Sequence, residues 1–580
     1  MDRIEKSRRP AYGGFGEGPD EGTKFASSEF RLTMPSPSTK KNLGLMLLGG
    51  ALLGLSYPPL HLGLLGVIAF LPFFVLFEDI TGYGKALRSA YGFIFVFNLI
   101  TLYWPGGFTH HKDLYMMLAG LAVILFHPVF FLITIPPFIF IRKRFGYRVA
   151  VLIFPFIWVA FEYLHSLTEY SFPWVLLGNT QSYNLPAIQM ASITGIYGIS
   201  FWLMCLNVSF YFLYSNLVRG RLKIRSSRFA LHVAGLILLY SVVVGYGWIV
   251  LGSRPDTEIA STSSLKVGLV QPNIDPFDKW TYPAETQIAI LESLTVEAAK
   301  QGAELVIWPE TAIPTYMLQP RHAVEFAAIR HRVDSLGIYL LTGVADIHFY
   351  PENGPAPRSA MTAANGRKYD SYNSTMLVPS GLDSVQLYHK IHLVPYAERV
   401  PYSDLLSFMN AMQWNFGLGG WGIGKDTTIF RFHDKRGREY LFSNAICFES
   451  VYPGFVAEFV KKGAQFITVT TNDSWWGNTS GVYQHRQIGI MRAVENRRWV
   501  AQDSDGGITC TIDPYGYVHN ESAFKTRDIV VATIEPSHEM TFYTLHGDWL
   551  AQACLVLSAC FVGAAAGKKT YDSIRAKENL

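Results

Sequence analysis

The chain has 580 residues, of which 49% are hydrophobic and 16% are charged, a balance that predicts a membrane protein with a soluble part. Its formal net charge of +4 is too small to indicate nucleic acid as a partner. Five scattered cysteines without a C-x-x-C pair do not fit a disulfide framework or a zinc site, so no metal is expected.

The first 39 residues are polar and rich in Gly, Pro, Ser and charge. A signal peptide would place its apolar stretch much sooner. We therefore expect residues 1–39 to form a disordered cytoplasmic tail.

Apolar runs that are candidates for membrane-spanning helices follow this tail, since about 20 apolar residues cross a bilayer. They lie near residues 42–57, 60–77, 88–104, 114–141, 149–164, 187–213, 229–251 and 549–566. The first two runs are short and meet at Tyr57-Pro58-Pro59. A re-entrant pair or a tightly packed hairpin is therefore an alternative to two full spans.

Lysine and arginine residues gather on one side of the predicted spans. They are Lys40, Lys41, Lys85, Arg88, Arg142, Lys143, Arg144, Arg148, Arg219, Arg221, Lys223, Arg225, Arg228, Lys568 and Lys569. The short loops of the other side carry only Lys112. By the positive-inside rule the basic side is cytoplasmic, so the large segment between the last two spans lies outside the cytoplasm.

This large segment alternates short β-branched apolar runs with amphipathic stretches, which is typical of a layered α/β domain. Predicted strands cover 265–270, 304–308, 338–344, 375–378, 441–446, 465–470, 507–512 and 529–534. Predicted helices cover 283–301, 322–335, 454–463 and 484–498. The predicted organisation is the tail, a transmembrane domain over 40–253, the α/β domain over 254–547, and a last transmembrane helix with a cytoplasmic tail over 548–580.

Three residues of the α/β domain have side chains suited to acyl transfer. Glu310 follows the strand in AELVIWPET, Lys390 lies in YHKIHLVPYAERVP, and Cys447 follows the strand in FSNAICFES. Taken singly, they can be a structural Glu, a surface Lys and a buried structural Cys. Together they supply a base, a cation for an oxyanion and a nucleophile, and we expect Lys390 to favour the thiolate of Cys447.

The segment 402–421 concentrates large apolar side chains beside the Lys390 motif, among them Trp414 and Trp421. We predict that it contacts the substrate, either as a mobile lid or as an arm that dips into the membrane interface and receives acyl chains. A core helix followed by a loop is the alternative.

The order Glu, Lys, Cys, each on or just after a strand, resembles that of the nitrilase (carbon-nitrogen hydrolase) superfamily. More narrowly, the chain resembles the apolipoprotein N-acyltransferase family in WPETAIP, NSTMLVPSG, YHKIHLVPYAERVP, CFES, TNDSWWG and QHRQIGIMRAVENRRW. SFPWVLLGNTQ, at residues 171–181, resembles the loop between membrane spans of that family. The fold implied is a polytopic α-helical membrane domain of about eight spans plus an extracytoplasmic α-β-β-α sandwich.

The resemblance implies Glu310 as general base, Lys390 as oxyanion stabiliser and Cys447 as nucleophile. It also implies supporting roles for Glu398, which lies after the Lys motif, and for Glu449, which follows the Cys.

The same resemblance gives Trp280, in QPNIDPFDKW, a role in binding the substrate. One segment departs from the family, because VAQDSDGGITCTIDPYG stands where an Arg-Ala-Thr-Asn-like stretch is usual. Asp503 and Asp505 are expected to add negative charge there, which leaves the details of the substrate pocket open.

The activity implied is transfer of a fatty acyl group from a membrane glycerophospholipid, through a cysteine thioester, to the α-amino group of the N-terminal diacylglyceryl-cysteine of a lipoprotein. We expect a monomer without a cofactor in the bacterial inner membrane, with its catalytic domain in the periplasm. The alternatives are a membrane-tethered amidohydrolase of the nitrilase type and a transporter or receptor with an inert α/β sensing domain.

Overall fold

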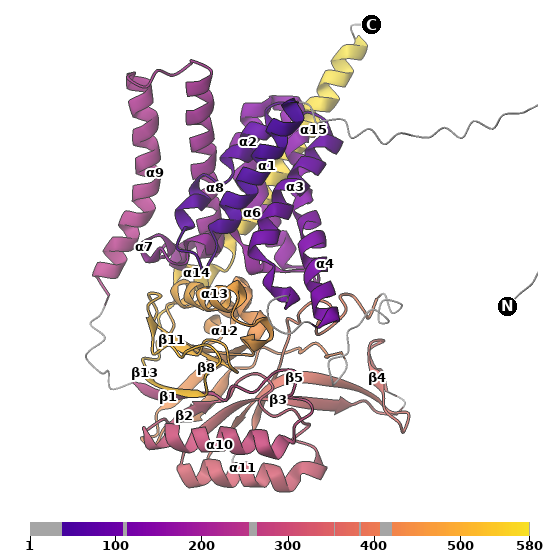
Figure 1. Ribbon diagram of the computed structural model, residues 1–580, viewed down its shortest axis with the longest axis vertical. Coiled ribbons are helices and arrows are strands. Elements are labelled where there is room, and N and C mark those ends of the chain that lie inside the picture. The colour runs from indigo at the N-terminus through magenta and orange to yellow at the C-terminus, as the bar shows by residue number, and fades with distance from the viewer. Residues whose placement is uncertain are drawn as a thin grey trace, which may run out of the picture. The chain divides into compact units, whose positions relative to one another are not determined.

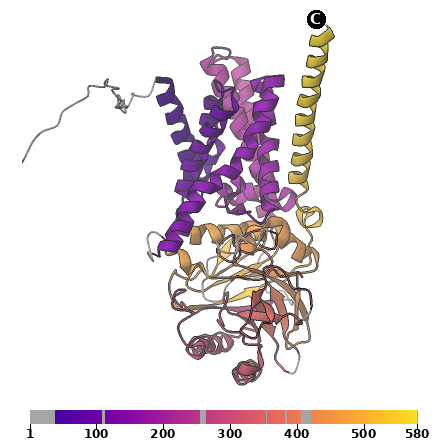
Figure 2. The ribbon, with the colours of Figure 1, turned by 90° about the vertical axis from the view of Figure 1, so that its right-hand side faces the viewer.

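The structure is a computed structural model that describes residues 37–107, 113–254, 264–352, 354–381, 384–405 and 420–578 (Figure 1). Its apolar helices are α1 (Pro37–Leu55), α2 (Leu71–Phe77), α3 (Tyr83–Thr101), α4 (Leu114–Phe131), α5 (Ile135–Phe145), α6 (Tyr147–Ser166), α7 (Leu185–Ile188), α8 (Ala191–Val218), α9 (Ser227–Gly252) and α15 (Trp549–Glu578). Figure 2 shows α15, the last element of the chain, running beside the earlier helices, and α15 contacts α6. The predicted tail lies almost wholly outside the described residues.

Five of the described helices are long and apolar enough to cross a membrane: the continuous stretch Met116–Phe145, α6, α8, α9 and α15. The predicted span at 60–77 is a shorter apolar helical stretch, Gly63–Phe77. Helices α1 and α3 have 19 residues each but do not reach the same apolarity. A helical membrane domain is therefore confirmed, whereas the count of eight spans is not.

Helices α1 and α3 pack closely because α1 presents glycines to α3. A Cβ atom at Gly50 would lie 2.5 Å from the carbonyl oxygen of Phe93, and one at Gly54 would lie 2.8 Å from Cβ of Ile100. No larger residue fits at these distances. Small residues of this kind let helices pack closely in lipid, where the hydrophobic effect does not drive their association.

The α/β domain contains two sheets. In the part of it that the structure describes, the first sheet has the strand order β13-β1-β2-β3-β5-β4, with β6 paired to β5, and the second has the order β12-β11-β10-β9-β8-β7. The strands of the first sheet are β1 (Leu265–Gln271), β2 (Leu305–Ile307), β3 (Tyr339–Phe349), β4 (Met361–Thr362), β5 (Lys368–Val378), β6 (Gln386–His389) and β13 (Asp528–Ile534). Those of the second are β7 (Phe430–His433), β8 (Glu439–Ile446), β9 (Phe466–Thr471), β10 (Val500–Ser504), β11 (Cys510–Ile512) and β12 (Val518–His519).

Alternate side chains of the two sheets meet in one core, because successive residues of a strand point to opposite faces. Leu265 and Val267 of β1 belong to the same buried cluster as Phe442 and Phe466 of the second sheet. The rings of Phe442 and Phe466 stack with centroids 5.0 Å apart. The opposite face of the first sheet, including Val306, forms a separate buried cluster.

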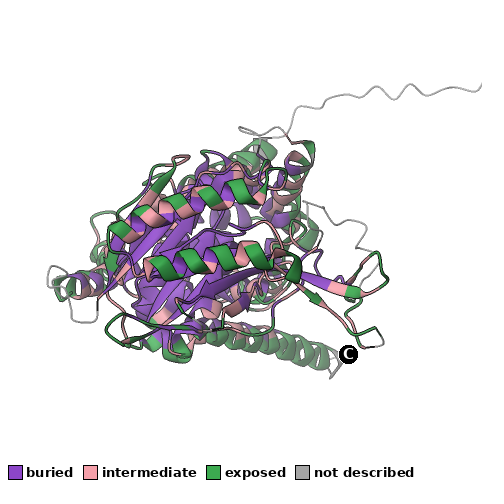
Figure 3. Ribbon diagram, turned by 90° about the horizontal axis from the view of Figure 1, so that it is seen from below, coloured by how far each residue is buried: buried purple, intermediate pink, exposed green. Residues whose placement is uncertain are grey.

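Helices cover the outer face of each sheet. Helices α10 (Ala284–Lys300) and α11 (Ala323–Leu336) lie on the first sheet, and Figure 3 shows their exposed sides above a buried layer. Helices α12 (Pro453–Lys461) and α13 (Ser480–Asn496) lie on the second, on the side of the apolar helices (Figure 1). The predicted α-β-β-α sandwich is confirmed.

The predicted strands and helices of this domain all have counterparts in the structure, but β4, β6, β7, β10 and β12 were not predicted. Strand β10 pairs with β9 in parallel, yet it contains Gln502, Asp503 and Ser504. A polar run of this kind does not show the alternation of a half-buried strand, although all three side chains are buried.

One side chain of α13 joins the α/β domain to the membrane helices. The Gln484 amide nitrogen donates to the carbonyl oxygens of Pro58, at 3.1 Å, and of Thr101, at 3.2 Å. The Gln484 amide oxygen accepts from the indole nitrogens of Trp104, at 3.1 Å, and of Trp174, at 2.8 Å. Because all of these groups are buried, α13 is held firmly against three membrane segments.

Candidate active site

The three residues predicted to be catalytic follow three strands and meet in one place. Glu310 lies after β2, while Lys390 and Cys447 come directly after β6 and β8. The Lys390 ammonium donates to Glu310 Oε1 at 3.0 Å. The charges of Glu310 and Lys390 both act on the pKa of the Cys447 thiol, which identifies the three as neighbours.

Lys390 is completely buried, so the alternative of a surface lysine is wrong. Its ammonium also donates to Glu398 Oε1 at 2.9 Å, and it therefore lies between two carboxylates. Burial alone would lower the pKa of Lys390, but Glu310 and Glu398 raise it well above its usual value. Lys390 is a fixed cation at neutral pH.

Glu310 is ionised in this setting. Burial tends to raise its pKa, but the Lys390 charge and the hydrogen bonds from Lys390 and Asn373 bring the pKa below its usual value. The Asn373 amide, from β5, donates to Glu310 Oε1 at 2.8 Å and to Glu398 Oε1 at 3.2 Å. Asn373 begins the motif NSTMLVPSG, but the sequence predicted no role for it. We call Glu310, Asn373, Lys390 and Glu398 the charged cluster.

Cys447 lies at a sharp turn between β8 and the short helix η8 (Cys447–Val451). Its φ of 52° is unusual for a residue with a side chain and indicates a backbone held by its surroundings. Burial and the charge of Glu310 raise the pKa of the thiol well above its usual value, against the opposing effect of Lys390. Lys390 therefore lowers the pKa of the thiol as predicted, but burial outweighs the ammonium, so that the pKa stays raised.

Glu449 ties the Cys447 turn to the Lys390 segment. It is fully buried, and one carboxylate oxygen accepts from the Tyr388 hydroxyl and from the Ile391 N–H, both at 2.6 Å. The other oxygen accepts from the Ile446 N–H at 2.8 Å. Burial raises the pKa of Glu449 to about 7, although these donors favour its ionised form. Its contacts fit a supporting role.

The tryptophans predicted to bind substrate are only partly described. Trp421 is buried, and its backbone N–H donates to the carbonyl oxygen of Glu398 at 3.0 Å, so it lies beside the charged cluster. Trp280 is half-buried. Trp414 lies outside the described residues, as does most of segment 402–421. Their roles in substrate binding stay predictions.

A second buried ion pair contacts the backbone of Glu310. The Lys279 ammonium donates to Asp505 at 2.9 Å and to the carbonyl oxygen of Glu310 at 3.1 Å. Burial, with the neighbouring Asp505, raises the pKa of Asp503 well above its usual value. The expectation of added negative charge is therefore wrong: Lys279 pairs with Asp505, and burial favours the neutral form of Asp503. Lys279 went unnoticed because it adjoins the more conspicuous Trp280.

A further buried network holds the turn that carries Cys447. His485 Nδ1 lies 2.8 Å from Asp473 Oδ1, and His485 Nε2 lies 2.8 Å from Ser450 Oγ. The Ser450 hydroxyl is also within 2.8 Å of the Cys447 carbonyl oxygen, to which it can donate. We call Ser450, His485 and Asp473 the turn network. The three residues belong to three different sequence motifs, and only their proximity in the fold reveals that they form one network.

The membrane loop at 171–181 lies against this turn. The Ser171 hydroxyl is 2.6 Å from that of Tyr452, and the ring of Phe172 lies 5.6 Å from that of Phe448, the residue after Cys447. The candidate nucleophile is thus held next to the membrane domain.

Among the described residues, no group of three or more His, Cys, Asp and Glu side chains is arranged to hold a metal ion. The chemistry available to the site is that of a buried carboxylate, an ammonium and a thiol. Such a set can form and break a thioester.

A two-sheet sandwich with Glu, Lys and Cys at strand ends, joined to apolar helices, defines a membrane-bound protein of the carbon-nitrogen hydrolase class. Residues 266–539 match the family described as carbon-nitrogen hydrolase, and residues 49–209 match that described as apolipoprotein N-acyltransferase N-terminal domain.

Relatives match along most of the chain. The apolipoprotein N-acyltransferase of Chlorobaculum tepidum is 33% identical over 534 residues, which cover 90% of this chain and 96% of that protein. The apolipoprotein N-acyltransferase of Geobacter metallireducens is 29% identical over 560 residues, which cover 93% and 98%. The chain belongs to the apolipoprotein N-acyltransferase family, and it is a membrane-bound bacterial acyltransferase.

Proposed function

We propose that this protein transfers a fatty acyl group from a membrane glycerophospholipid to the α-amino group of the N-terminal diacylglyceryl-cysteine of lipoproteins. The observation that carries the proposal is the buried Glu310–Lys390 pair beside Cys447, on a turn that packs against a membrane loop. A diacyl lipid and a lipidated protein both reside in the bilayer. A nucleophile held at the bilayer surface can meet both in a defined orientation.

In the first half-reaction the Cys447 sulfur attacks the ester carbonyl of the phospholipid, and Glu310 accepts the thiol proton as the S–C bond forms. A base is required because the raised pKa of Cys447 keeps the thiol protonated at neutral pH. Lys390 stabilises the oxyanion of the tetrahedral intermediate. Collapse breaks the ester C–O bond, Glu310 returns the proton to the leaving oxygen, and a lysophospholipid departs.

In the second half-reaction the α-amino group attacks the thioester, and Glu310 accepts a proton from the nitrogen. The C–S bond then breaks, the sulfur regains a proton, and the product is an amide. Glu398 and Glu449 have supporting roles. Glu398 accepts a hydrogen bond from the ammonium of Lys390, and Glu449 joins the segment after Lys390 to the turn at Cys447. No cofactor takes part in either step.

The enzyme is proposed to act as a monomer in the inner membrane, with its catalytic domain in the periplasm. The grouping of basic residues supports this orientation. Lys568 of α15 donates to the carbonyl oxygen of Arg144 at 2.9 Å, which brings basic ends of α15 and α5 together. The domain limits proposed are 40–253, 254–547 and 548–580, after a tail over 1–39.

Mass spectrometry of the purified protein, incubated with a phospholipid, tests the proposal. We expect a fatty acyl adduct on Cys447 that hydroxylamine removes and that a diacylated lipopeptide discharges with formation of an amide. The rival amidohydrolase would discharge the adduct to water at the same rate with or without the lipopeptide. Absence of any adduct on Cys447 would exclude the thioester mechanism.

A further inference from the structure

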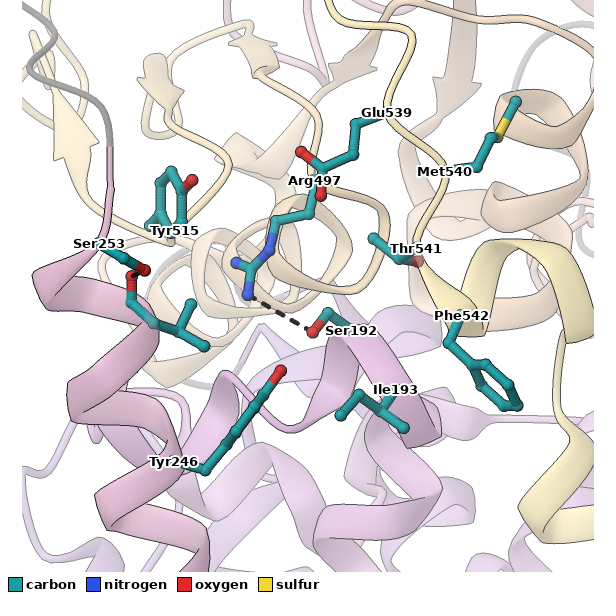
Figure 4. A pocket seen from close by; sticks show the side chains of 11 residues that line it. Ser192, Ile193, Tyr246, Ser253, Arg497, Tyr515, Glu539, Met540, Thr541 and Phe542 are labelled. Carbon is teal, nitrogen blue, oxygen red and sulfur yellow. Dashed lines mark hydrogen bonds between the residues drawn. The ribbon is translucent and has the colours of Figure 1, made fainter.

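A cavity of about 370 Å³ lies where α8 and α9 meet the α/β domain (Figure 4). Its polar lining comes from Ser192 of α8, Tyr246 of α9, and Arg497, Tyr515 and Glu539 of the α/β domain. None of these residues belongs to the charged cluster or to the turn network.

Arg497 is the buried cation of this cavity. Only 5% of it is exposed, and it lies just after the last residue of α13. One guanidinium nitrogen donates to Gln189 Oε1 and to the Pro514 carbonyl oxygen, both at 2.8 Å, and the other donates to Ser192 Oγ at 3.4 Å. All three acceptors are neutral.

Within the described residues, no carboxylate lies at salt-bridging distance from Arg497, in contrast to Arg492 of the same helix, which pairs with Glu495 at 2.8 Å. A buried charge without a counter-ion is costly. Burial lowers the pKa of Arg497 from its usual value. The nitrogen that donates to Ser192 carries a second N–H, which is available to an anionic ligand.

The rim of the cavity carries the opposite charge. Glu539 is exposed and lines the same cavity, and the ring of Tyr515 lies 4.8 Å from the Arg497 guanidinium. Figure 4 shows the Glu539 and Tyr515 side chains on either side of Arg497. A ligand that reaches from the buried guanidinium to this rim therefore meets first a cation and then an anion.

The cavity opens among exposed apolar side chains that are suited to lipid. On the same lining, Ile193 is 36% exposed, Met540 37% and Phe542 48%. On α9, Trp248 is 63% and Ile249 73% exposed, and both stand in the sequence between the lining residues Tyr246 and Val250. Because α9 is long and apolar enough to span a membrane, these side chains lie at or in the bilayer surface that faces the α/β domain.

We propose that this cavity binds the head group of a zwitterionic glycerophospholipid, with the phosphate on Arg497, the ammonium on Glu539, and the acyl chains along the apolar side chains outside. A guanidinium N–H donates a charge-assisted hydrogen bond to a phosphate oxygen, and a carboxylate and a tyrosine ring are groups that bind an ammonium. The site is separate from Cys447 and does not depend on the proposed acyl transfer. Its role is to anchor the α/β domain to the surface of the bilayer.

Native mass spectrometry of the full-length protein tests this inference. The Cys447→Ala background is used throughout, so that lipid in the candidate active site is not consumed. The probes are dioleoylphosphatidylethanolamine, dioleoylphosphatidylglycerol, dioleoylglycerol and inorganic phosphate, each titrated into detergent-solubilised protein. We expect the phosphatidylethanolamine to occupy one more high-affinity position than the dioleoylglycerol.

Arg497→Gln should weaken binding at that position by roughly tenfold or more, since it removes a charge-assisted contact. Glu539→Gln should weaken phosphatidylethanolamine alone, by about twofold to fivefold, because an exposed ion pair contributes little. Arg436→Gln, at an exposed arginine in the turn between β7 and β8, is the matched control and should change nothing.

Arg497→Gln removes buried hydrogen bonds and can fail to fold. In that case the lipid binding of Arg497→Lys and of Glu539→Gln tests the inference. Lys keeps the charge and should retain most of the binding. Equal retention of all three lipids, or an unchanged lipid preference in both Arg497→Lys and Glu539→Gln, overturns the inference. Binding of inorganic phosphate as tight as that of phosphatidylethanolamine also overturns it, since the ligand is then a free anion.

Discussion

Two buried polar networks adjoin Cys447, and they differ in their access to solvent. The charged cluster places one ammonium between two carboxylates that keep some access to solvent, with side-chain exposures of 10% for Glu310 and 15% for Glu398. The turn network has no exposed part: both His485 and Asp473 are completely buried. Both networks influence the thiol, because the charges of Glu310, Lys390 and Asp473 act on the pKa of Cys447.

The difference suggests a division of labour. A group that exchanges protons with a substrate needs a reachable oxygen, as Glu310 has, and a pKa suited to the task. A network that is sealed from solvent has no path for a substrate proton, but it fixes geometry, and small displacements of a nucleophile cost rate. We therefore expect changes in the charged cluster to alter the chemistry and its pH dependence, and changes in the turn network to alter rate and stability alone.

Loss of the nucleophile should have the largest effect. Cys447→Ala and Cys447→Ser are expected to abolish both the acyl adduct and transfer to a lipopeptide, while the protein stays folded because the change in volume is small. The adduct is measured by mass spectrometry and the fold by thermal unfolding. Cys560→Ser, at an exposed cysteine, is the control. Near-normal transfer by Cys447→Ala would refute the mechanism.

Loss of the base should come next. Glu310→Gln keeps the shape and an oxygen that can accept from Lys390, but it cannot take the thiol proton. We expect acyl-enzyme formation to slow by about 10²–10⁴-fold, the usual contribution of a general base. Single-turnover mass spectrometry measures the rate. An adduct that accumulates at the wild-type rate would assign the base to another group.

Removal of the cation should cost somewhat less in rate but should change the pH profile. Lys390→Met is expected to slow both half-reactions by about 10²–10³-fold. Lys390→Arg keeps the charge but puts a broad fork where a compact ammonium fits, so it should rescue little activity. Burial would raise the pKa of Glu310, and Lys390 holds it below its usual value. In Lys390→Met the acid limb of the activity profile should therefore move to higher pH.

The raised pKa of Cys447 itself gives a further prediction. Because burial and Glu310 hold the thiol protonated, its reaction with a small neutral alkylating reagent should quicken by about tenfold per pH unit from pH 7 to pH 9 without a plateau. The measurement is the rate of Cys447 modification by mass spectrometry. A plateau near pH 7 would mean that the thiolate is already formed at neutral pH.

The sequence predicted the reactive residues at strand ends but not the hydrogen-bond partners that connect them into networks. Glu310, Lys390 and Cys447 could be found because each stands after a recognisable strand and has a reactive side chain. Asn373, which bridges Glu310 and Glu398, has no such signal, since a polar residue inside a buried strand looks like an exposed position.

The same limit explains the errors over charge and pKa. Sequence proximity suggested that Asp505 adds negative charge, whereas a lysine more than two hundred residues away in the chain neutralises it. Lys390 lowers the pKa of Cys447 as predicted, but burial, which a sequence does not display, raises that pKa by more. The positions of most long strands and the reactive groups after them could be predicted from the sequence pattern, but desolvation and long-range pairing could not.

The turn network should give the smallest effect, and it tests the division of labour most sharply. His485 touches Asp473 on one ring nitrogen and Ser450 on the other, and Ser450 reaches the carbonyl oxygen of Cys447. His485→Gln can keep at most part of this chain of contacts and leaves a buried group without a partner. That change should cost about 1–3 kcal/mol of stability.

We expect His485→Gln to lower kcat for transfer by roughly tenfold, because the strained turn at Cys447 relaxes and the sulfur is displaced from its attacking position. Ser450→Ala should cost less, since it removes one contact to the Cys447 carbonyl and leaves the His485–Asp473 pair intact. In neither variant should the acid limb of the activity profile move, because Glu310 and Lys390 keep their contacts. The readouts are thermal unfolding, kcat against KM, and the pH profile. A shift of the acid limb in His485→Gln, comparable to that in Lys390→Met, would show that the turn network exchanges protons with the site, and the distinction between the two networks would fail.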